Sequence, residues 1–561
     1  MNADDADLVF LALGGAGEIG MNMYLYGHGR RGQRRWIMVD CGVAFGDMDS
    51  SPGIDLMMAD PAFIAARADR LDGIFVTHAH EDHIGALGRL WPMLKAPVYA
   101  RPFTASHIRR KFEEAGVSQK AIKVIDGLGP VQAGPFKVRF QPVTHSIPET
   151  SALVIDTPAG RIVHTADFKV DHDPQLGPAF DRAAFEAIGA EGVQALVCDS
   201  TNVFLDGHGG SEAEVMTPLT EIINGAKGAV AATTFASNVA RLRSLARAAS
   251  QCGRAVVLVG RAMVRMVEAA EAAGILTDFP STMSEQEAKK VPAEHLFYLM
   301  TGSQGEGRAA LARVASGTHP TVSLGQGDLV IFSSKTIPGN ESEVIRIWNQ
   351  LAERGVQVVD ENTEGLSGRI HVSGHARRAD IKALYDALKP RLAVPMHGEY
   401  RHLVEHARFA ESLGVPMVPA PNGTVLAIDG ARPEVIDEVE TGLLYLDGET
   451  LIGSMDGVVR SRLKLARQGL VTVALVVDET GDLLADPAVR VLGGPDKAQG
   501  WPASLEQMLY DEVDAAVDGM PKKGRTDTAI EEAAGRAVRK VCGRRWGKKP
   551  LVQVIVTRLE D

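Results

Sequence analysis

Three histidines and two acidic residues stand within six consecutive positions of one short segment. The segment is VTHAHEDHIG, residues 76–85, and it follows an apolar run. His78 and His80 are two positions apart, so on an extended chain their side chains point to the same side. Asp82 and His83 follow where the chain turns. Because imidazole and carboxylate ligands together suit zinc and also manganese, the HxHxDH spacing predicts a metal site rather than a satisfied histidine cluster on a surface loop.

Three further ligand-type residues lie far along the chain, each directly after an apolar run that reads as a strand. His145 stands in PVTHSIPET, Asp167 in HTADFK and His397 in VPMHGEY. Functional groups of α/β folds gather where strands end, although each of these residues alone could equally be a turn residue. The two oxygens of Asp167 suit it to bridge two cations. We assign two metal sites, one of His78, His80 and His145 and the other of Asp82, His83 and His397.

The elements that must position these residues change in style along the chain. Residues 7–200 read as many short strands with few long helices, which predicts a β-rich α/β sandwich. From about 212 to 370, helices and strands alternate, as in a parallel α/β unit. The strand-rich pattern returns from 380 to 430, with predicted strands at Leu392–Met396 and Val415–Val418.

A final α/β unit is predicted from about residue 460. It opens with a strand at Val471–Val477 and closes with one at Val552–Thr557. Two helices are expected between them. Each is opened by a capping-box pattern, Ser504-x-x-Gln507 and Thr528-x-x-Glu531.

The composition is that of a soluble globular protein. The chain has 561 residues, of which 45% are apolar and 23% charged, and this length favours about three or four domains. The start, MNADDADLVF, has no basic n-region, and no run approaches the ~20 apolar residues of a membrane span. We therefore expect a cytoplasmic protein with no membrane partner.

Cysteine usage and net charge bear on the kind of metal site, the cellular compartment and the binding partner. The four cysteines form no CxxC pair, which argues against a cysteine zinc knuckle and fits a reducing compartment. A net charge of −12 counts mildly against a nucleic-acid partner. It does not exclude one, because bound divalent cations would add positive charge.

One motif near the start is a decoy. The run Gly15–Gly20, GAGEIG, matches the GxGxxG pattern of dinucleotide-binding folds, and Asp40 stands at a suitable distance. A dinucleotide site also needs a helix directly after the glycines. The next residues, MNMYLY, have a β-rich character instead, so we interpret the glycines as a turn between strands.

The HxHxDH set with the later histidines and aspartate resembles the metallo-β-lactamase fold, an α/β protein with an αβ/βα sandwich and metals at its mouth. The long interval between Asp199 and His397 resembles the inserted α/β domain of the β-CASP nucleases, which process nucleic acids. Four stretches carry this second likeness: VCDSTN at 197–202, TTFASN at 233–238, HVSGH at 371–375 and HGEY at 397–400.

Nearly the whole chain is similar to the bacterial ribonuclease J family. GGAGEIGMN, the Asp40–Gly42 triplet, and HVSGH followed by HGEY carry the likeness, and departures such as Met21 touch no proposed ligand. The resemblance implies four segments. They are 1–211 for the first part of the metallo-β-lactamase domain, 212–375 for the β-CASP domain, 376–455 for the return segment and linker, and 456–561 for a small C-terminal α/β domain.

The same resemblance implies roles for individual residues. Asp82 would orient the attacking hydroxide as well as bind metal, and Asp40 would orient a ligand imidazole. Asp199 and His375 would handle protons, although Asp199 could instead be a helix N-cap and His375 could only bind phosphate. A phosphate-holding loop is implied, with Ser237 beside it. The loop residues are His371, Val372, Ser373, Gly374 and His375.

We therefore expect a hydrolase with two divalent metal ions, Zn²⁺ in the first place and Mn²⁺ or Mg²⁺ as alternatives. The resemblance implies a 5′→3′ exoribonuclease that prefers RNA with a 5′-monophosphate and also cuts internally, in rRNA processing and mRNA decay. A triphosphate would be excluded from the 5′ pocket by its size. The resemblance further implies a homo-oligomer, a dimer or tetramer, with other RNA-decay proteins as candidate partners.

Three other interpretations stay open at this point. The chain could be a metallo-hydrolase of small molecules, a DNA-directed β-CASP nuclease, or an inactive subunit. The insertion and HVSGH disfavour the first, and the complete ligand set disfavours the last. The basic run 535–549, GRAVRKVCGRRWGKK, could contact RNA through Trp546, but we favour a solvated helix end with cations near its C-terminus.

Overall fold

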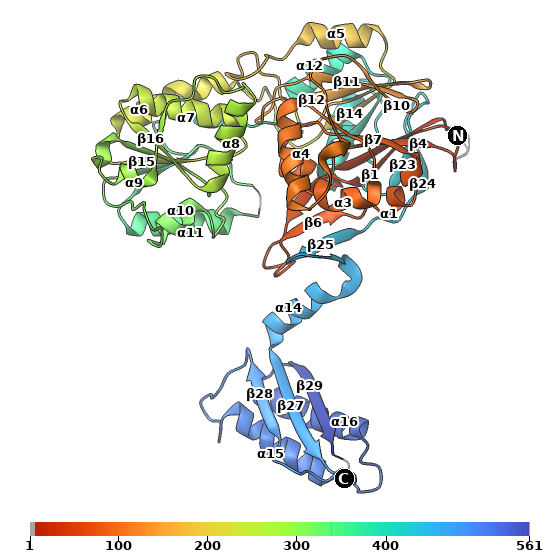
Figure 1. Cartoon of the computed structure of the whole chain (residues 1–561), viewed down its shortest axis with the longest axis vertical. Helices are drawn as coiled ribbons and strands as arrows, with labels where there is room; N and C mark the ends of the chain where they lie inside the picture. Colours follow the sequence, from red (N-terminus) through yellow and green to blue (C-terminus); the bar gives the residue numbers. More distant parts are fainter. Residues whose placement is uncertain (1–5, 338, 560–561) are drawn as a thin grey trace. The chain divides into compact units, whose positions relative to one another are not determined.

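The computed structural model describes residues 6–337 and 339–559. Within these residues the chain forms two compact units. The first contains residues 6–44 and 58–443, and the second contains residues 45–57 and 444–559. Figure 1 follows the chain through both units.

Two β-sheets form the body of the first unit. Their facing sides share one apolar core, in which Phe10 and Tyr24 of the larger sheet pack in the same cluster as Phe140 and Leu153 of the smaller. The larger sheet has the order β24 (Glu434–Glu438), β23 (Thr424–Ala427), β1 (Leu8–Gly14), β3 (Met23–His28), β4 (Arg35–Val39), β7 (Leu71–Phe75), β8 (Val98–Ala100), β9 (Ile122–Val124). The smaller has the order β10 (Val131–Ala133), β11 (Phe136–Pro142), β12 (Ser151–Thr157), β13 (Gly160–His164), β14 (Ala195–Asp199), β21 (Leu392–Met396).

Helices cover the outer faces of this pair of sheets. A second apolar cluster joins Phe185 and Ile381 of the outer helices to Leu196 and Ala393 of the smaller sheet. The helices on this side are α5 (Arg182–Ala190), α12 (Arg378–Leu388) and α13 (Tyr400–Ser412). The helices associated with the larger sheet are α1 (Ala62–Ala65), α2 (Glu81–Ile84), α3 (Leu87–Leu94) and α4 (Pro102–Glu114). Helix, sheet, sheet and helix follow one another, as the predicted αβ/βα sandwich requires.

A third sheet is inserted between β14 and β21. Its six strands pair in parallel throughout, and Figure 1 shows α6 and α7 on one side of it and α10 and α11 on the other. The order is β17 (Thr282–Met283), β16 (Ala255–Val259), β18 (Leu296–Met300), β15 (Val230–Thr233), β19 (Leu329–Phe332), β20 (Gln357–Val359). Its helices are α6 (Met216–Gly225), α7 (Val239–Gln251), α8 (Arg261–Ala272), α9 (Glu285–Ala288), α10 (Ala310–Ala315) and α11 (Glu341–Glu353).

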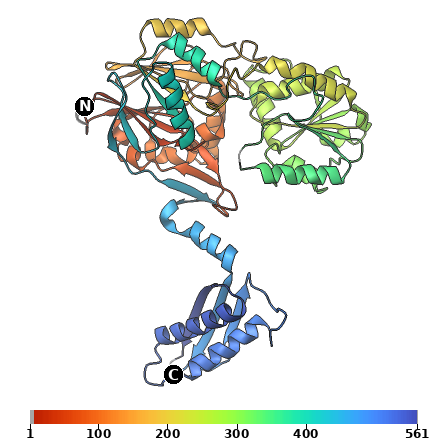
Figure 2. The ribbon, with the colours of Figure 1, turned by 180° about the vertical axis from the view of Figure 1, so that it is seen from behind.

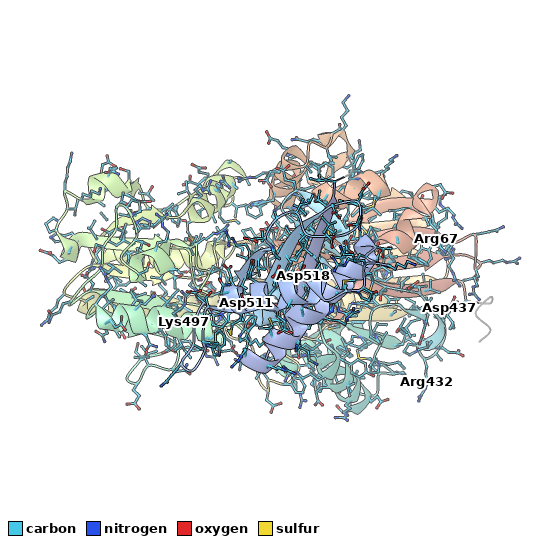
Figure 3. The ribbon with its side chains drawn as sticks, turned by 90° about the horizontal axis from the view of Figure 1, so that it is seen from below. Arg67, Arg432, Asp437, Lys497, Asp511 and Asp518 are labelled. Carbon is cyan, nitrogen blue, oxygen red and sulfur yellow. The ribbon has the colours of Figure 1, made fainter. Side chains whose placement is uncertain are left out.

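The second unit has a sheet with helices on one face only. β27 (Leu470–Val477) lies between β28 (Ala488–Leu492) and β29 (Leu551–Arg558), and its residues alternate between buried and half-buried. The buried set packs against α15 (Leu505–Asp518) and α16 (Asp527–Arg545). These helices lie behind the strands in Figure 1 and in front of them in Figure 2. The outer side of α15 carries Asp511 and Asp518 (Figure 3).

Three smaller features complete the topology. β2 (Ala16–Gly17) pairs with β22 (Gly398–Glu399), and α14 (Val458–Gln468) precedes β27. A four-stranded sheet has the order β26 (Thr450–Gly453), β25 (Leu443–Asp447), β6 (Leu56–Ala59), β5 (Val43–Phe45). Among the described residues, no helix combines the length and apolar character that a membrane crossing requires.

The strand predicted at Val415–Val418 is wrong. Met417 makes only an isolated bridge to Ala393. Pro416 accepts a hydrogen bond from the Ala393 amide, but proline has no amide hydrogen to return, so the segment cannot form a full ladder.

The predicted helix starts in the second unit are half right. Ser504 caps α15, and its hydroxyl accepts a hydrogen bond from the Gln507 amide. In contrast, α16 is capped by Thr526, whose hydroxyl accepts from the Ala529 amide. Thr528 therefore lies inside the first turn, because a threonine two positions earlier already occupies the capping position.

The glycine run connects β1 to β3 without a helix, as expected, and contains the two-residue strand β2. Gly15, Gly17 and Gly20 have φ values of 85°, 98° and 96°, and the next element is the strand β3. A side chain at Gly15 would meet Asn22 and Tyr24 at 2.3 and 2.4 Å, so glycine is required there. The connection also serves the site, because the Gly15 carbonyl accepts a hydrogen bond of 2.8 Å from the His397 amide.

Candidate active site

The predicted ligands lie where strands of both central sheets end. β7 ends at Phe75 and leads directly into the histidine-rich segment. β14 and β21 are parallel neighbours, and Asp199 stands opposite Met396 in their register. Because parallel strands end at the same edge of a sheet, the chain brings His397 beside Asp199 although almost two hundred residues separate them.

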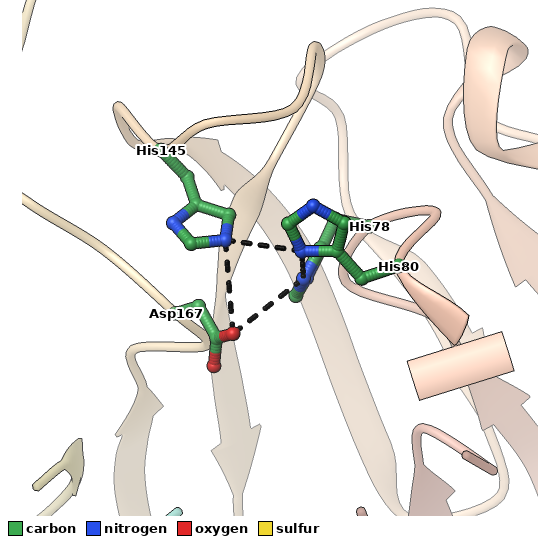
Figure 4. A group of neighbouring side chains, drawn as sticks. All are labelled: His78, His80, His145 and Asp167. Atoms are coloured by element: carbon green, nitrogen blue, oxygen red, sulfur yellow. Dashed lines mark hydrogen bonds and ion pairs between the residues drawn. The ribbon is translucent and has the colours of Figure 1, made fainter. Parts of the chain in front are cut away.

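Four ligand atoms form a first cluster, drawn in Figure 4. His80 Nδ1 lies 3.1 Å from His78 Nε2 and 3.2 Å from His145 Nε2. Asp167 Oδ2 lies 3.7 Å from both His78 Nε2 and His145 Nε2. All four atoms lie within 4.8 Å of one another. This is the set assigned from the sequence to the first metal, with Asp167 added.

A second cluster shares Asp167 with the first. His83 Nε2 lies 3.2 Å from Asp167 Oδ2 and 3.4 Å from Asp82 Oδ2. His397 Nε2 lies 3.2 Å from Asp82 Oδ2 and 3.6 Å from Asp167 Oδ1. These four groups also lie within 4.8 Å of one another. Asp167 thus stands between the two sets of ligands, where a bridging carboxylate would be needed.

The donor set fits divalent cations. Ligands at about 2.0–2.1 Å from a tetrahedral ion lie roughly 3.3 Å from one another, which is close to the separations in both clusters. Asp167 Oδ1 is buried and accepts no hydrogen bond among the described residues, although a buried carboxylate oxygen normally has a partner. A bound cation would supply that partner and would offset the burial of two carboxylates and five imidazoles.

Hydroxyl groups orient two of the ligand imidazoles. Thr77 donates to Asp40 at 2.9 Å and therefore accepts from His78 Nδ1, also at 2.9 Å. Thr201 donates to Asp199 at 2.7 Å and accepts from His397 Nδ1 at 2.9 Å. Both bonds leave Nε2 free to face the cluster, as in most metal sites. Sequence reasoning gave neither threonine a role, although Thr77 directly precedes His78 and Thr201 lies in the VCDSTN stretch.

The other imidazoles have partners of different kinds. His83 Nδ1 donates to Asp40 at 2.7 Å, which is the contact expected of Asp40. His145 Nδ1 donates to the Gly374 carbonyl at 2.7 Å. His80 Nε2 lies 3.0 Å from Ser237 Oγ. Ser237, expected beside the phosphate-holding loop, therefore reaches out of the inserted domain to His80, a predicted metal ligand.

Three of the eight non-glycine residues with positive φ in the described part of the chain lie at the site. Asp40, Ala166 and His397 have φ values of 62°, 54° and 51°, in the left-handed region that is unfavourable for residues with a side chain. Each value belongs to a predicted site residue or to the neighbour of one. Such strain persists only where surrounding contacts hold it, and it is common at functional sites.

Asp199 and His375 form a close pair beside the second cluster. His375 Nδ1 lies 2.8 Å from Asp199 Oδ2, while Asp199 Oδ1 accepts from the Thr201 amide at 2.8 Å. No helix starts at Asp199, so the helix N-cap alternative does not apply. Burial lowers the pKa of His375, but the charge and hydrogen bond of Asp199 outweigh it and raise the pKa overall.

The predicted phosphate-holding loop is anchored to the same site. Asn202 donates to Ser373 Oγ at 2.9 Å and to the His375 carbonyl at 3.1 Å. A side chain at Gly374 would meet His145 at 2.7 Å, so only glycine permits this approach. Asn202 is a further residue that sequence reasoning did not single out, although it lies in the VCDSTN stretch.

A cavity of about 450 Å³ lies beside the loop. Its wall includes His371, Val372 and Ser373 from the loop. Basic side chains outnumber acidic ones in the rest of the wall. These charged residues are Lys335, Arg369, Arg377 and Glu361. The excess of positive charge favours an anionic ligand.

Four family models match successive parts of the chain. The β-lactamase superfamily domain matches residues 35–193, and the ribonuclease J β-CASP domain matches residues 227–351. The Zn-dependent metallo-hydrolase RNA specificity domain matches residues 368–419, and the ribonuclease J C-terminal domain matches residues 457–559. These matches confirm the predicted fold class.

Whole-chain relatives agree with the family models. The ribonuclease J of Sinorhizobium meliloti is 45% identical over 562 residues, which cover 99% of this chain and 98% of the relative. The ribonuclease J of Corynebacterium glutamicum is 36% identical and is matched over 97% of this chain and 75% of its own length. That of Thermus thermophilus is 32% identical, over 97% of this chain and 94% of its own length.

A crystal structure of a protein of unknown function from Enterococcus faecalis V583 has a similar fold. Its TM-score is 0.50 at 16% sequence identity, and the match covers 74% of this chain and 99% of that one. At this identity the likeness concerns the fold alone.

Proposed function

The chain belongs to the ribonuclease J family, and from this premise we propose how it acts on RNA. It is a metal-dependent ribonuclease, a hydrolase that cuts RNA phosphodiesters. The complete ligand set, together with the RNA specificity domain and the ribonuclease relatives, disfavours an inactive subunit and a hydrolase of small molecules. The direction of cleavage, the number of metal ions and the role of each residue are our proposals.

We propose that two divalent cations bind, the first to His78, His80 and His145 and the second to Asp82, His83 and His397, with Asp167 shared. The observation that carries this is the pair of four-atom clusters that meet at Asp167. Imidazole-rich sets favour Zn²⁺, with Mn²⁺ and Mg²⁺ as alternatives. When bound, such ions lower the pKa of water and polarise the phosphate.

The side chains of this protein then orient the attacking water and transfer protons. Asp82 orients the attacking water. Asp199 and His375, 2.8 Å apart, handle the proton that the leaving 3′-oxygen requires. The charge and hydrogen bond of Asp199 raise the pKa of His375, and Thr201 links Asp199 to His397. Asp40 is a positioning residue, because it acts through Thr77 and His83.

We further propose that the loop of residues 371–375 receives the 5′-monophosphate of RNA and directs 5′→3′ exonuclease cleavage. Ser373 and His371 line the cavity, which has three basic side chains and one acidic side chain. The loop touches the metal-ligand residue His145 through Gly374. A phosphate held there fixes the distance from the RNA end to the scissile bond. Internal cleavage uses the same metal clusters without this contact.

The C-terminal domain is proposed to support a dimer or tetramer. Its sheet is covered by helices on one face, whereas Leu492 and Ile555 are 64% and 45% exposed. Ile555 stands opposite Ala474 of the central strand in the register. One register row of the same face carries Arg490, Thr472 and Gln553. A sheet face that combines exposed apolar and polar side chains in this way fits a second copy of the chain. We retain the limits 1–211, 212–375, 376–455 and 456–561 for the segments.

The deciding experiment compares three RNAs of one sequence that carry a 5′-monophosphate, a 5′-triphosphate or a 5′-hydroxyl, with and without a chelator. We expect the monophosphorylated RNA to be digested fastest and the chelator to stop all cleavage. Ser373→Ala should slow end-dependent digestion about tenfold and leave internal cutting unchanged. Equal rates on all three ends would contradict the 5′ pocket. Faster digestion of a matched DNA would favour a DNA-directed nuclease.

A further inference from the structure

A buried ion pair lies in the inserted domain, outside the metal clusters. Arg241 of α7 is fully buried. Its Nε lies 2.6 Å from Glu212 Oε1 and its Nη2 lies 2.9 Å from Glu212 Oε2. A buried charge of this kind is costly unless it is paired and fully hydrogen-bonded. Glu212 therefore accounts for two of the three guanidinium nitrogens and leaves Nη1 for another purpose.

The third nitrogen of Arg241 binds the start of the phosphate-holding loop. Nη1 donates to the Ser333 carbonyl and hydroxyl, each at 2.9 Å, and to the Ile370 carbonyl at 3.3 Å. Ser333 in turn donates to the same Ile370 carbonyl at 2.6 Å. Two donors thus converge on the carbonyl directly before His371. Ser333 and Ile370 are both fully buried, so water cannot replace these bonds.

The far end of the loop is held by the metal-site residues. Gly374 accepts from His145, and His375 pairs with Asp199. The loop is therefore held between Arg241 at one end and the metal clusters at the other. A change at either end would alter where His371 and Ser373 stand in the cavity wall.

Arg241 also lies against the imidazole of His371. Nη1 lies 3.3 Å from His371 Nδ1. Burial and then the charge of Arg241 lower the pKa of His371 to about 3, against the opposing hydrogen bond to the Ser333 carbonyl. The imidazole is therefore neutral near pH 7, and it shares the Ser333 carbonyl with Arg241.

We propose that Arg241, held by Glu212, is a positioning residue that sets the phosphate-holding loop, with His371 at its start, for the RNA 5′-phosphate. This inference rests on the proposed 5′ pocket. Arg241 is not itself a wall residue of the cavity, and the contacts of its side chain include none of the proposed metal ligands. Its effect must therefore pass through Ile370 and His371, which do line the cavity.

The test compares two conservative variants with a matched control. In Arg241→Lys the ammonium can still pair with Glu212. It cannot at the same time donate to the Ile370 carbonyl, because it lacks the planar fork of the guanidinium. Ser333→Ala removes the second donor to Ile370 and keeps the ion pair. Arg254→Lys is the control, because Arg254 is also buried in this domain and donates to the carbonyls of Gly228, Leu296 and Ala226.

The full-length enzyme loaded with metal is assayed on RNAs that differ only in a 5′-monophosphate or a 5′-hydroxyl. For Arg241→Lys and Ser333→Ala we expect KM on the monophosphorylated RNA to rise about tenfold. The kcat value, the bound metal and KM on the hydroxyl RNA should stay near wild type. Arg254→Lys should lower the melting temperature but keep the wild-type preference between the two ends.

Two results would overturn the assignment, and they can be told apart. If the wild-type enzyme does not distinguish the two RNAs, the 5′ pocket fails and Arg241 loses its proposed role with it. If the wild type prefers the monophosphate and the Arg241 and Ser333 variants keep that preference as fully as Arg254→Lys does, the pocket stands and only the role of Arg241 is refuted.

Discussion

The two clusters of predicted metal ligands in the first unit, which we call the metal-cluster region, are buried to a similar degree as the core of the second unit. The two regions differ in the chemical character of their side chains. In the first, His78, Asp167 and Asp40 are at most 1% exposed, and each is ionisable. In the second, the core consists of apolar side chains such as Leu509 and Val538, and Arg525, a buried charged residue beside it, pairs with Asp482. Burial of apolar surface stabilises a fold, whereas burial of charge costs free energy unless each group is paired.

This contrast separates function from stability. In the metal-cluster region, Asp82 contacts His397 across 315 positions of sequence. Hydroxyl groups, carboxylates and backbone with positive φ hold the imidazoles in their orientations. The second unit forms its core from elements that follow one another between Leu470 and Arg558. We therefore expect substitutions in the first region to remove activity with little loss of stability, and substitutions in the second to do the reverse.

The largest effect is expected from Asp167→Ala. Loss of the shared carboxylate should lower kcat by roughly 10³-fold or more, because metal-ion catalysis contributes several kcal/mol. The bound metal per chain, measured by elemental analysis, should fall too. Asp511→Ala, at an exposed site on α15, is the control. Unchanged metal content and turnover in Asp167→Ala would break the comparison.

Leu509→Ala tests the core of the second unit. Leu509 is fully buried in the apolar cluster, so the free energy of unfolding should fall by about 3 kcal/mol, measured by urea denaturation. Metal content and turnover per folded molecule should equal those of the wild type. The partner variant Gln507→Ala, on the exposed side of the same helix, should change stability by less than about 0.5 kcal/mol. A loss of activity at constant folded fraction would contradict the separation.

A pH dependence should distinguish the two units. His406 is fully buried between Ser200 and Tyr385. Burial lowers its pKa to about 4, with Asp199 opposing the shift. The unfolded chain then binds the proton first, so this stability is complete above about pH 6.5 and is lost as the pH falls toward 4. Residues 45–57 and 444–561 contain no histidine.

Between pH 7 and pH 5, the wild type should lose about 2 kcal/mol more than His406→Asn, as measured by urea unfolding at both values. The change in the free energy of unfolding between the two pH values is the readout, because the variant is itself less stable at pH 7. Parallel slopes for the two proteins would refute the assignment to His406. Leu509→Ala should keep the wild-type slope.

The smallest effect is expected at the open sheet face. Ile555→Lys should raise the dissociation constant of the oligomer about tenfold, through the loss of apolar contact area, as measured by analytical ultracentrifugation. The melting temperature at low concentration should not change. Ala515→Lys adds the same charge to the helical side of this unit and should leave association intact. If Ala515→Lys dissociates the oligomer and Ile555→Lys does not, the contact lies on the helices.

The local parts of the site were predictable from the sequence. HxHxDH is a short pattern within one segment, and each of the later predicted ligands follows an apolar run that forms a strand. The spacing of residues and the ends of apolar runs were therefore enough to find them. The same logic found Ser504 as a helix cap. It failed at Val415–Val418, where one proline removes a donor, and at Thr528, where another threonine stood two residues earlier. Both errors come from competition between neighbouring residues that is decided by hydrogen bonds.

The sequence by itself determined which residue types were available to bind metal and phosphate, because their chemistry belongs to the side chains. Only the tertiary structure decided which of them share a proton or an orientation. Thr201 reaches His397, Ser237 reaches His80, and Arg241 reaches Ile370, each across a separation that no sequence period encodes. Such contacts depend on the crossing of strands and helices from different sheets, and a distance of about 3 Å can be set only when all of those elements have packed.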